Sequence, residues 1–231
     1  MSLATQRLTV VDLGLVPYEE AWDRQRRMAA QRAAGEIGDT LLLLEHPHTY
    51  TFGSSGKREH LLVPEAELRA QGVAILDVDR GGDVTYHGPG QLVGYPILRL
   101  RDYGINVVPY LRCLEEVLIR LAAAYGLAAA RQRGYTGVWV ADEKLAAIGT
   151  KVDTNGITRH GFALNVSTDL RRFETIVPCG IRDRGVCSLE SLLGRPVARA
   201  EAVARTAQAF EDVFDPAVAP LVATPRERRN D

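Results

Sequence analysis

The stretch Leu145-Ala-Ala-Ile-Gly-Thr-Lys-Val-Asp-Thr-Asn-Gly-Ile-Thr-Arg-His-Gly-Phe-Ala-Leu-Asn-Val166 carries the strongest hairpin signal in the chain. Its Asn155-Gly156 pair suits a two-residue turn, because both residue types tolerate a positive φ. The pattern therefore predicts that 145–153 and 157–166 are antiparallel strands joined by this turn.

Helical and extended segments surround the predicted hairpin. Apolar residues at helical spacing and glycine stop signals predict helices over 17–34, 64–70, 106–125 and 200–214. Short apolar runs predict strands over 8–16, 40–45, 73–79, 92–98 and 138–141, with 49–52 continuing the second of these. Hairpins mixed with helices favour an α+β fold, a sandwich of a mixed, mainly antiparallel sheet and packed helices.

The composition is that of an ordinary globular protein, with 231 residues of which 46% are hydrophobic and 25% charged. No repeat or linker divides the chain, so we expect a single domain over 1–231 with a mobile tail from about residue 222. The 28 Lys and Arg balance the 29 Asp and Glu, which disfavours nucleic acid and membrane surfaces as partners. Three widely spaced cysteines and the lack of a signal-peptide pattern favour a cytoplasmic protein.

The segment Arg80-Gly-Gly-Asp-Val-Thr-Tyr-His-Gly-Pro-Gly-Gln91 holds four glycines between two predicted strands. Glycine permits tight turns and lets a ligand approach the main chain closely, although a long hairpin loop would also explain it. The hydrogen-bonding side chains of Arg80, Thr85, His87 and Gln91 favour a ligand site over a plain turn. Neither of the common phosphate-binding glycine patterns occurs, so a nucleotide site has no direct support.

Cys179 is the best candidate for a nucleophile. It lies between Pro178 and Gly180, a context that favours a loop over a helix or central strand. Cys113 falls in a predicted helix as a small buried hydrophobe, and Cys187 precedes a predicted helix start.

A thiol attacks as its thiolate, so Cys179 requires a neighbouring cation or base. Lys144 opens an apolar stretch in which its pKa could be lowered. An exposed lysine at a strand end is, however, the more common case for any one lysine. Sequence spacing does not choose between Lys144 and the histidines, which are His46, His48, His60, His87 and His160.

Five ordered blocks resemble the lipoyl(octanoyl) transferase family. They are Leu44-Glu-His-Pro47, Arg80 to Gln91, Lys144-Leu-Ala-Ala-Ile-Gly149, His160-Gly-Phe-Ala-Leu-Asn165 and Val177-Pro-Cys-Gly-Ile181. The resemblance implies the fold of biotin and lipoate protein ligases. It also implies transfer of an octanoyl group from acyl carrier protein to a lipoyl-domain lysine, the first step of protein lipoylation. The acceptors would be 2-oxoacid dehydrogenases or the glycine cleavage H protein, and neither ATP nor metal would be needed.

The same resemblance assigns roles to individual residues. Cys179 would form the acyl thioester, and Lys144 would lower the pKa of its thiol and act as acid and base. The acyl-binding residues would be Arg80, Gly81, Gly82, Asp83, Val84, Thr85, Tyr86, His87, Ala147, Ile148, Gly149, His160, Gly161, Phe162 and Ala163. The chemistry of acyl transfer, and not the resemblance, leads us to expect that backbone N–H groups either near Cys179 or in the glycine-rich segment stabilise the oxyanion.

Three other functions remain compatible with the sequence. An ATP-dependent lipoate or biotin-type ligase would use the same scaffold without a nucleophilic cysteine. A cysteine–histidine thioesterase would transfer the acyl group to water. A binding module for carrier or lipoyl domains would leave Cys179 with a structural role alone.

Overall fold

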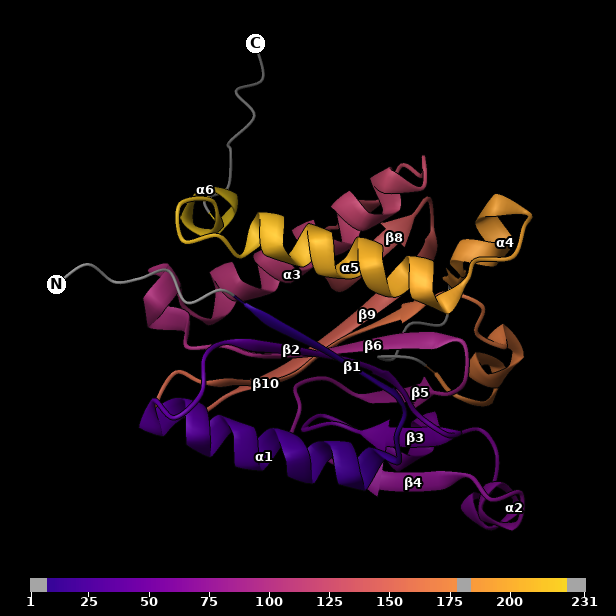
Figure 1. The fold of residues 1–231 in the computed structure, drawn as a ribbon. Helices are drawn as coiled ribbons and strands as arrows, with labels where there is room; N and C mark the ends of the chain where they lie inside the picture. The colour runs from indigo at the N-terminus through magenta and orange to yellow at the C-terminus, as the bar shows by residue number, and fades with distance from the viewer. Residues whose placement is uncertain (1–7, 178–183, 224–231) are drawn as a thin grey trace, which may run out of the picture.

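The computed structural model describes residues 8–177 and 184–223. Within these ranges, a large twisted sheet lies between two layers, as Figure 1 shows. Three helices cover one face: α3 (Val107–Ala124), α5 (Arg199–Val213) and α6 (Ala219–Ala223). Helix α1 (Tyr18–Ala34) and a smaller sheet cover the other face. The predicted α+β class is confirmed.

The large sheet has the strand order β1-β2-β6-β10-β9-β8-β7. Its bounds are β1 (Thr9–Leu15), β2 (Thr40–Glu45), β6 (Gln91–Ile97), β7 (Ala130–Gln132), β8 (Tyr135–Val140), β9 (Glu143–Val152) and β10 (Thr158–Asn165). Strands β1 and β2 are parallel, and the other neighbours along this order are antiparallel. The hairpin predicted at Asn155-Gly156 is present as β9–β10, with Val152 paired to Thr158. A short strand, β11 (Gly185–Val186), pairs in parallel with the start of β9.

The smaller sheet has the order β4-β3-β5 and was not predicted. Its strands are β3 (Thr49–Phe52), β4 (Ala74–Asp77) and β5 (Val84–His87). The expectation that 49–52 continues the preceding strand is wrong, because β3 leaves the large sheet and pairs with β4 and β5 instead. The glycine-rich segment is likewise not one loop, because its middle four residues form β5. Both errors concern pairings with strands distant in the sequence.

The predicted helices are present within a residue or two of their expected ends. Gly35 ends α1 in a left-handed conformation with φ of 80°, as its stop signal predicted. Short helices complete the described chain: α2 (Glu65–Ala70), α4 (Leu189–Leu193) and the 3-10 turns Arg58–His60, Leu100–Tyr103 and Leu170–Thr175. A capping box between Ser188 and Ser191 begins α4, just after Cys187. The predicted tail from 222 falls almost entirely outside the described residues, and the single domain stays a prediction.

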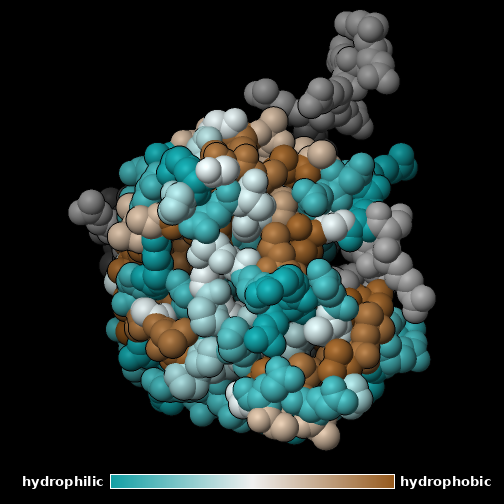
Figure 2. All heavy atoms as spheres, turned by 90° about the vertical axis from the view of Figure 1, so that its right-hand side faces the viewer, coloured by the Kyte–Doolittle hydropathy of each residue, from teal (hydrophilic) through white to brown (hydrophobic). Residues whose placement is uncertain are grey.

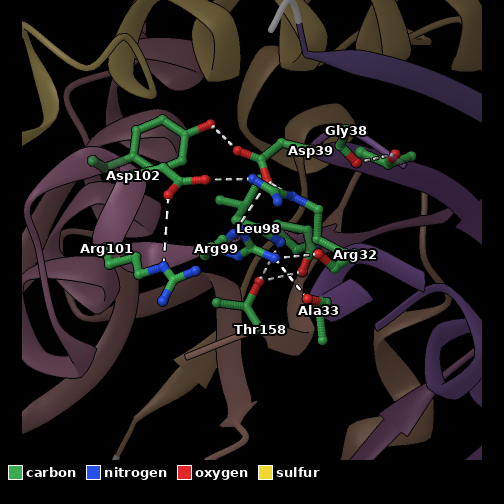
Figure 3. A network of polar contacts seen from close by, with 12 residues as sticks. Arg32, Ala33, Gly38, Asp39, Leu98, Arg99, Arg101, Asp102 and Thr158 are labelled. Carbon is green, nitrogen blue, oxygen red and sulfur yellow. Dashed lines mark hydrogen bonds and ion pairs between the residues drawn. The ribbon is translucent and has the colours of Figure 1, made fainter. Parts of the chain in front are cut away.

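The main core lies between α3, α5 and the large sheet. Helix α3 buries three of the apolar residues that predicted it, Leu114, Leu118 and Leu121, and Cys113 lies among them, whereas Val108 in its first turn is exposed. A buried ionic network fastens the C-terminal end of α1 to the start of β2, as Figure 3 shows. Arg32 Nε donates to Asp39 at 2.6 Å, and the Tyr103 hydroxyl donates to the other oxygen of Asp39 at 2.8 Å. This network holds the far end of the helix whose first turn enters the candidate site.

The surface that carries α2 and α4 is mixed, with apolar patches between hydrophilic side chains (Figure 2). Isolated apolar patches of this kind are normal for a folded protein. Among residues 8–177 and 184–223, no helix is both long and apolar enough to span a bilayer.

Candidate functional site

A cavity opens between the two sheets, at the point where β5 and the turn before it face β9 and β10. Its empty volume is about 480 Å³ when the space at its open mouth is included. Residues from α1, β5, β6, β9 and β10 contribute to the wall. They are Tyr18, Arg80, Gly81, Gly82, Asp83, Thr85, His87, Tyr95, Ala147, Ile148, Gly149, His160, Gly161, Phe162 and Ala163. Most of the predicted acyl-binding residues thus lie around one space.

The cavity wall on the large sheet is made of small residues in cross-strand pairs. Ala147 pairs with Ala163, and Gly149 pairs with Gly161 two residues further along. Because side chains of a strand alternate between faces, both pairs lie on the same face. A strip of sheet without bulky side chains is the result, and it follows β9 and β10 lengthwise.

The two glycines of this strip are required by close backbone contacts. A Cβ atom at Gly149 would lie 2.9 Å from the carbonyl oxygen of Gly81, and Gly81 N donates to Thr150 O at 2.9 Å. A Cβ at Gly161 would collide with the carbonyl oxygen of Gly94. The glycine-rich turn therefore packs directly on the strip and closes one side of the cavity.

Arg80 is 7% exposed and stabilises this turn. Its Nη2 donates to Thr51 O at 2.7 Å and to Asp83 O at 2.8 Å, and its Nη1 donates to Gly81 O at 3.1 Å. The guanidinium thus satisfies backbone carbonyls of the turn and of β3.

Strand β5 divides the predicted residues between two environments. Thr85 and His87 line the cavity. Val84 and Tyr86 instead lie in the core of the smaller sheet, where Tyr86 contacts Tyr50. The structure therefore does not place Val84 and Tyr86 in the cavity wall, because a strand directs successive side chains to opposite faces.

His46 lies beside the cavity as a neutral imidazole. Its Nδ1 is 2.7 Å from the carbonyl oxygen of Val16, which can only accept, so Nδ1 carries the hydrogen. Nε2 therefore accepts from the Tyr95 hydroxyl, also at 2.7 Å. Burial lowers the pKa of His46 to about 4, so it is neutral at physiological pH.

His160 is held in the tautomer opposite to that of His46, with its hydrogen on Nε2. Its backbone is in a left-handed conformation, with φ of 54°. Its Nε2 donates to Asp79 at 2.8 Å, which leaves Nδ1 to accept from the Tyr18 hydroxyl at 3.4 Å. The amide oxygen of Gln25 accepts from His160 N at 2.6 Å. Burial lowers the pKa of His160, and its hydrogen bond holds the pKa of Asp79 well below the usual value. These contacts stabilise a conformation that side chains seldom adopt.

His87 belongs to a buried chain of hydrogen bonds. The Gln91 amide donates to Asn165 at 3.0 Å and to Tyr86 O at 3.2 Å, so its oxygen accepts from His87 Nδ1 at 2.8 Å. Asn165 in turn donates to the carbonyl oxygen of Cys187 at 3.0 Å. Complete burial lowers the pKa of His87 well below its ordinary value.

Four of the polar residues around the cavity therefore point their hydrogens into the protein. Tyr95, Tyr18 and His160 donate to His46, His160 and Asp79 respectively, and the Arg80 guanidinium donates to carbonyls. A wall whose donors are already satisfied does not have to be hydrated, so it can accept an apolar chain without losing hydrogen bonds. Sequence reasoning missed Tyr18 and Tyr95, because only the packing of α1 and β6 brings their hydroxyls here.

Lys144 lies inside β9 and not at an exposed strand end, with only 8% of its surface exposed. Its Nζ lies 4.8 Å from the ring centroid of Trp139, a cation–π contact. It pairs with Val186 of β11, and its carbonyl oxygen accepts from Cys187 N at 3.1 Å. Lys144 does not line the cavity, but Ala147 of the same strand does, three residues further on.

Cys179 lies outside the described residues, so its predicted contact with Lys144 stays a prediction. The described chain ends at Val177, whose N donates to His60 O at 2.8 Å. It resumes at Arg184, just before β11 pairs with the strand of Lys144. The other two cysteines are buried in the protein, which raises the pKa of Cys113 and of Cys187 to about 12.

The family model of the lipoyl protein ligase A/B catalytic domain matches residues 17–211. The chain belongs to this family. An octanoyltransferase from Chloroflexus aggregans is 52% identical over 210 residues, which cover 90% of this chain and 95% of that protein. An octanoyltransferase from Rubrobacter xylanophilus is 51% identical over 202 residues, covering 87% and 90%. The predicted family and the predicted enzyme class, an acyltransferase, are confirmed.

Solved structures with low sequence identity share the fold. A lipoate-protein ligase A bound with ATP matches with a TM-score of 0.68 at 15% identity, over 94% of this chain and 92% of that one. A lipoate protein ligase from Thermoplasma acidophilum, described with its E2 lipoyl domain, matches at 0.66 and 16%, over 94% and 89%. The biotin protein ligase of Aquifex aeolicus matches at 0.50 and 12%, over 89% and 67%. The predicted biotin/lipoate ligase fold is confirmed.

Proposed function

We propose that this acyltransferase moves an octanoyl group from acyl carrier protein to a lysine of a lipoyl domain, through a thioester on Cys179. The observation that carries the proposal is the cavity, whose strip of small residues follows β9 from the neighbourhood of Lys144. The octanoyltransferase relatives support the identity of the acyl group.

The cavity suits a saturated chain of medium length. Burial of each methylene contributes about 0.8 kcal/mol, so the six methylenes of an octanoyl group would contribute about 5 kcal/mol. The satisfied donors of Tyr18, Tyr95 and His160 make this burial possible beside polar side chains. Ala147 and Ala163 leave room for the chain above the sheet.

The first chemical step would form the acyl-enzyme. The Lys144 ammonium would favour the Cys179 thiolate by charge. This thiolate attacks the carbonyl carbon of the octanoyl thioester, and the bond to the carrier sulfur breaks. The Lys144 ammonium would give its proton to the departing carrier thiolate, which leaves Lys144 neutral. Cys113 and Cys187 are poor alternatives, because a thiol with a pKa of about 12 is ionised in roughly one molecule in 100,000 at pH 7.

The second step would pass the acyl group to the acceptor. The lysine amine attacks the thioester carbonyl, neutral Lys144 takes the proton from the attacking nitrogen, and the Cys179 thiolate leaves. An amide is more stable than a thioester, so this step needs no ATP. The ligase from Thermoplasma acidophilum, described with its lipoyl domain, supports a lipoyl-domain acceptor.

Intact-protein mass after incubation with octanoyl carrier protein tests the proposal. We expect the wild type to gain one octanoyl group, Cys179→Ala to gain none, and Cys113→Ala to behave as wild type. Lys144→Ala should slow the gain at least 100-fold, whereas Lys151→Ala, an exposed lysine of the same strand, should not. An adduct that persists on Cys179→Ala would remove this residue from the reaction.

Two additions to this experiment separate the rival functions. A reaction that requires ATP and starts from free octanoate would indicate a ligase of the kind seen in the structural relatives. Release of octanoate without an acceptor, at the rate of transfer to a lipoyl domain, would indicate a thioesterase.

A further inference from the structure

The segment from Lys57 to Leu62 connects two parts of the molecule that the reaction must hold together. One is the glycine-rich turn that closes the cavity, and the other is the backbone of 175–177, which precedes Cys179 in the sequence. The connection runs through His60, a residue that neither the family blocks nor the cavity wall includes.

Asp83 forms the end of this connection at the cavity. It is 7% exposed and lines the cavity wall. One carboxylate oxygen accepts from Val84 N at 2.7 Å and from Lys57 N at 3.0 Å. The other oxygen accepts from His60 Nδ1 in a short hydrogen bond. Each oxygen of the Asp83 carboxylate thus accepts one hydrogen bond from the segment 57–62.

The backbone of His60 forms the other end. Its carbonyl oxygen accepts from Val177 N at 2.8 Å, Leu61 pairs with Ile176, and Leu62 N donates to Thr175 O at 2.8 Å. This short antiparallel ladder ends at Val177, two residues before Cys179 in the sequence.

We infer that His60 and Asp83 are positioning residues, which fix residues 175–177, the last described residues before Cys179, relative to the acyl cavity. The inference rests on the proposed function. Two hydrogen bonds, from Lys57 N and from His60 Nδ1, join the Asp83 carboxylate of the cavity wall to this segment, and His60 is the one of the two donors whose backbone also carries 175–177. A shift of the cavity wall is therefore transmitted to 175–177 through His60. Displacing reacting groups by about 1 Å can slow a reaction about 100-fold.

The side chain of His60 contributes no apolar packing to the core. Its imidazole is 15% exposed and belongs to no apolar cluster, whereas the adjacent Leu61 packs on the core of the smaller sheet. Substitution of His60 therefore removes the side-chain hydrogen bond to Asp83 without emptying the core.

The experiment compares His60→Leu with His60→Asn. Leu and Asn both branch at Cγ, as His does. The amide nitrogen of Asn takes the place of Nδ1 and restores the donor, whereas Leu has no donor. His60→Ala serves as a second loss variant that adds no apolar bulk. His48→Ala is the control, because His48 also bonds through Nδ1, to the Tyr86 hydroxyl at 2.7 Å, but touches neither the ladder nor the cavity wall.

The single-turnover rate of Cys179 octanoylation is measured over a range of octanoyl carrier protein concentrations. We expect His60→Leu and His60→Ala to lower the saturating rate at least tenfold and to change the half-saturating concentration less than threefold. His60→Asn should remain within threefold of wild type, and His48→Ala within twofold. A merely structural residue would not show this separation of rate from binding, or this rescue by a donor.

Two kinds of result would overturn the inference. One is a saturating rate within threefold of wild type in both loss variants. The other is a His60→Asn variant that is as slow as His60→Leu although both melt at the wild-type temperature. Failure of the proposed function looks different, because then the wild type itself would carry no octanoyl group on Cys179.

Discussion

Lys144 and Trp139 form a cation–π pair at the start of β9, with Nζ 4.8 Å from the ring centroid. The two residues are paired neighbours on β8 and β9, so the register of the sheet fixes this contact. Gly137, with φ of 120°, lets β8 lie close to β9, because a Cβ atom at Gly137 would lie only 2.6 Å from the carbonyl oxygen of Ala146. The indole face favours the charged form of a lysine that is almost fully buried.

Removal of the Trp139 indole should therefore weaken the activation of the Cys179 thiol that we propose for Lys144. A buried cation–π contact contributes about 2 kcal/mol, so we expect Trp139→Leu to slow octanoylation at pH 7 roughly 30-fold. Trp139→Phe keeps an aromatic face and should remain within fivefold of wild type. The pH profile of Cys179 alkylation checks the cause, since its midpoint should rise in Trp139→Leu. An unchanged midpoint would show that Trp139 acts in another way.

The paired alanines of β9 and β10 should set the acyl chain length. Ala163→Val adds two methyl groups beside the cavity and should exclude about two methylenes of the chain, a loss of about 1.6 kcal/mol or roughly 15-fold for octanoyl transfer. Hexanoyl transfer should change less than threefold.

Competition between hexanoyl and octanoyl carrier protein, read as the ratio of the two adducts, measures this selectivity. Ala130→Val on the exposed edge strand β7 is the control and should leave the ratio unchanged. An equal loss with both chains in Ala163→Val would mean that this alanine does not select chain length.

Local sequence signals predicted the elements that depend on neighbouring residues. The periodic apolar residues of α3 and the Asn155-Gly156 turn each specify a structure within one short window, and both are present. The smaller sheet could not be predicted in this way, because β3 pairs with strands some 25 to 35 residues away along the sequence. Nothing in the four residues of β3 distinguishes a partner in β4 from a continuation of β2.

The same limit applies to the site. The glycine-rich segment and the small residues of the hairpin were predicted to lie together, and they line one cavity. The orientation of Val84 and Tyr86 away from the cavity could not be predicted without knowing that a strand, β5, begins inside the glycine-rich segment. Tyr18 and Tyr95 lie in a helix and a strand whose packing no local pattern reveals. His60 connects two loops through a contact that only the folded chain creates.

Acid should destabilise the protein through its buried neutral histidines. The unfolded chain binds a proton at His46 below about pH 6.5, but the folded protein does so only below about pH 4. Between these values the unfolded state holds more protons, so stability is lost as the pH falls. His46 alone should lower the free energy of unfolding by about 2 kcal/mol between pH 7 and pH 5, and His87 and His160 act in the same direction.

Urea unfolding at pH 7 and pH 5 measures this loss. His46→Gln should be less stable than wild type at pH 7, because it disturbs the contacts with Val16 and Tyr95, but it should lose about 2 kcal/mol less on acidification. His48→Gln, at a less buried histidine, should keep most of the pH dependence. An identical acid loss in His46→Gln and wild type would contradict this account.

The buried pair of Arg32 and Asp39 should stabilise the fold without taking part in the reaction. Arg32 is 14 residues from Tyr18 along α1, which places it roughly 21 Å from the cavity end of the helix. Arg32→Ala leaves the buried Asp39 carboxylate without its cation, and breaking such a pair costs about 3 kcal/mol. For a chain of this length the melting temperature should fall by roughly 6 to 12 °C.

Arg26→Ala breaks an exposed pair with Asp23 and should cost no more than about 0.5 kcal/mol. Below the melting transition, both variants should transfer octanoyl within twofold of wild type. A folded Arg32→Ala protein with tenfold lower activity would show that the far end of α1 affects the cavity.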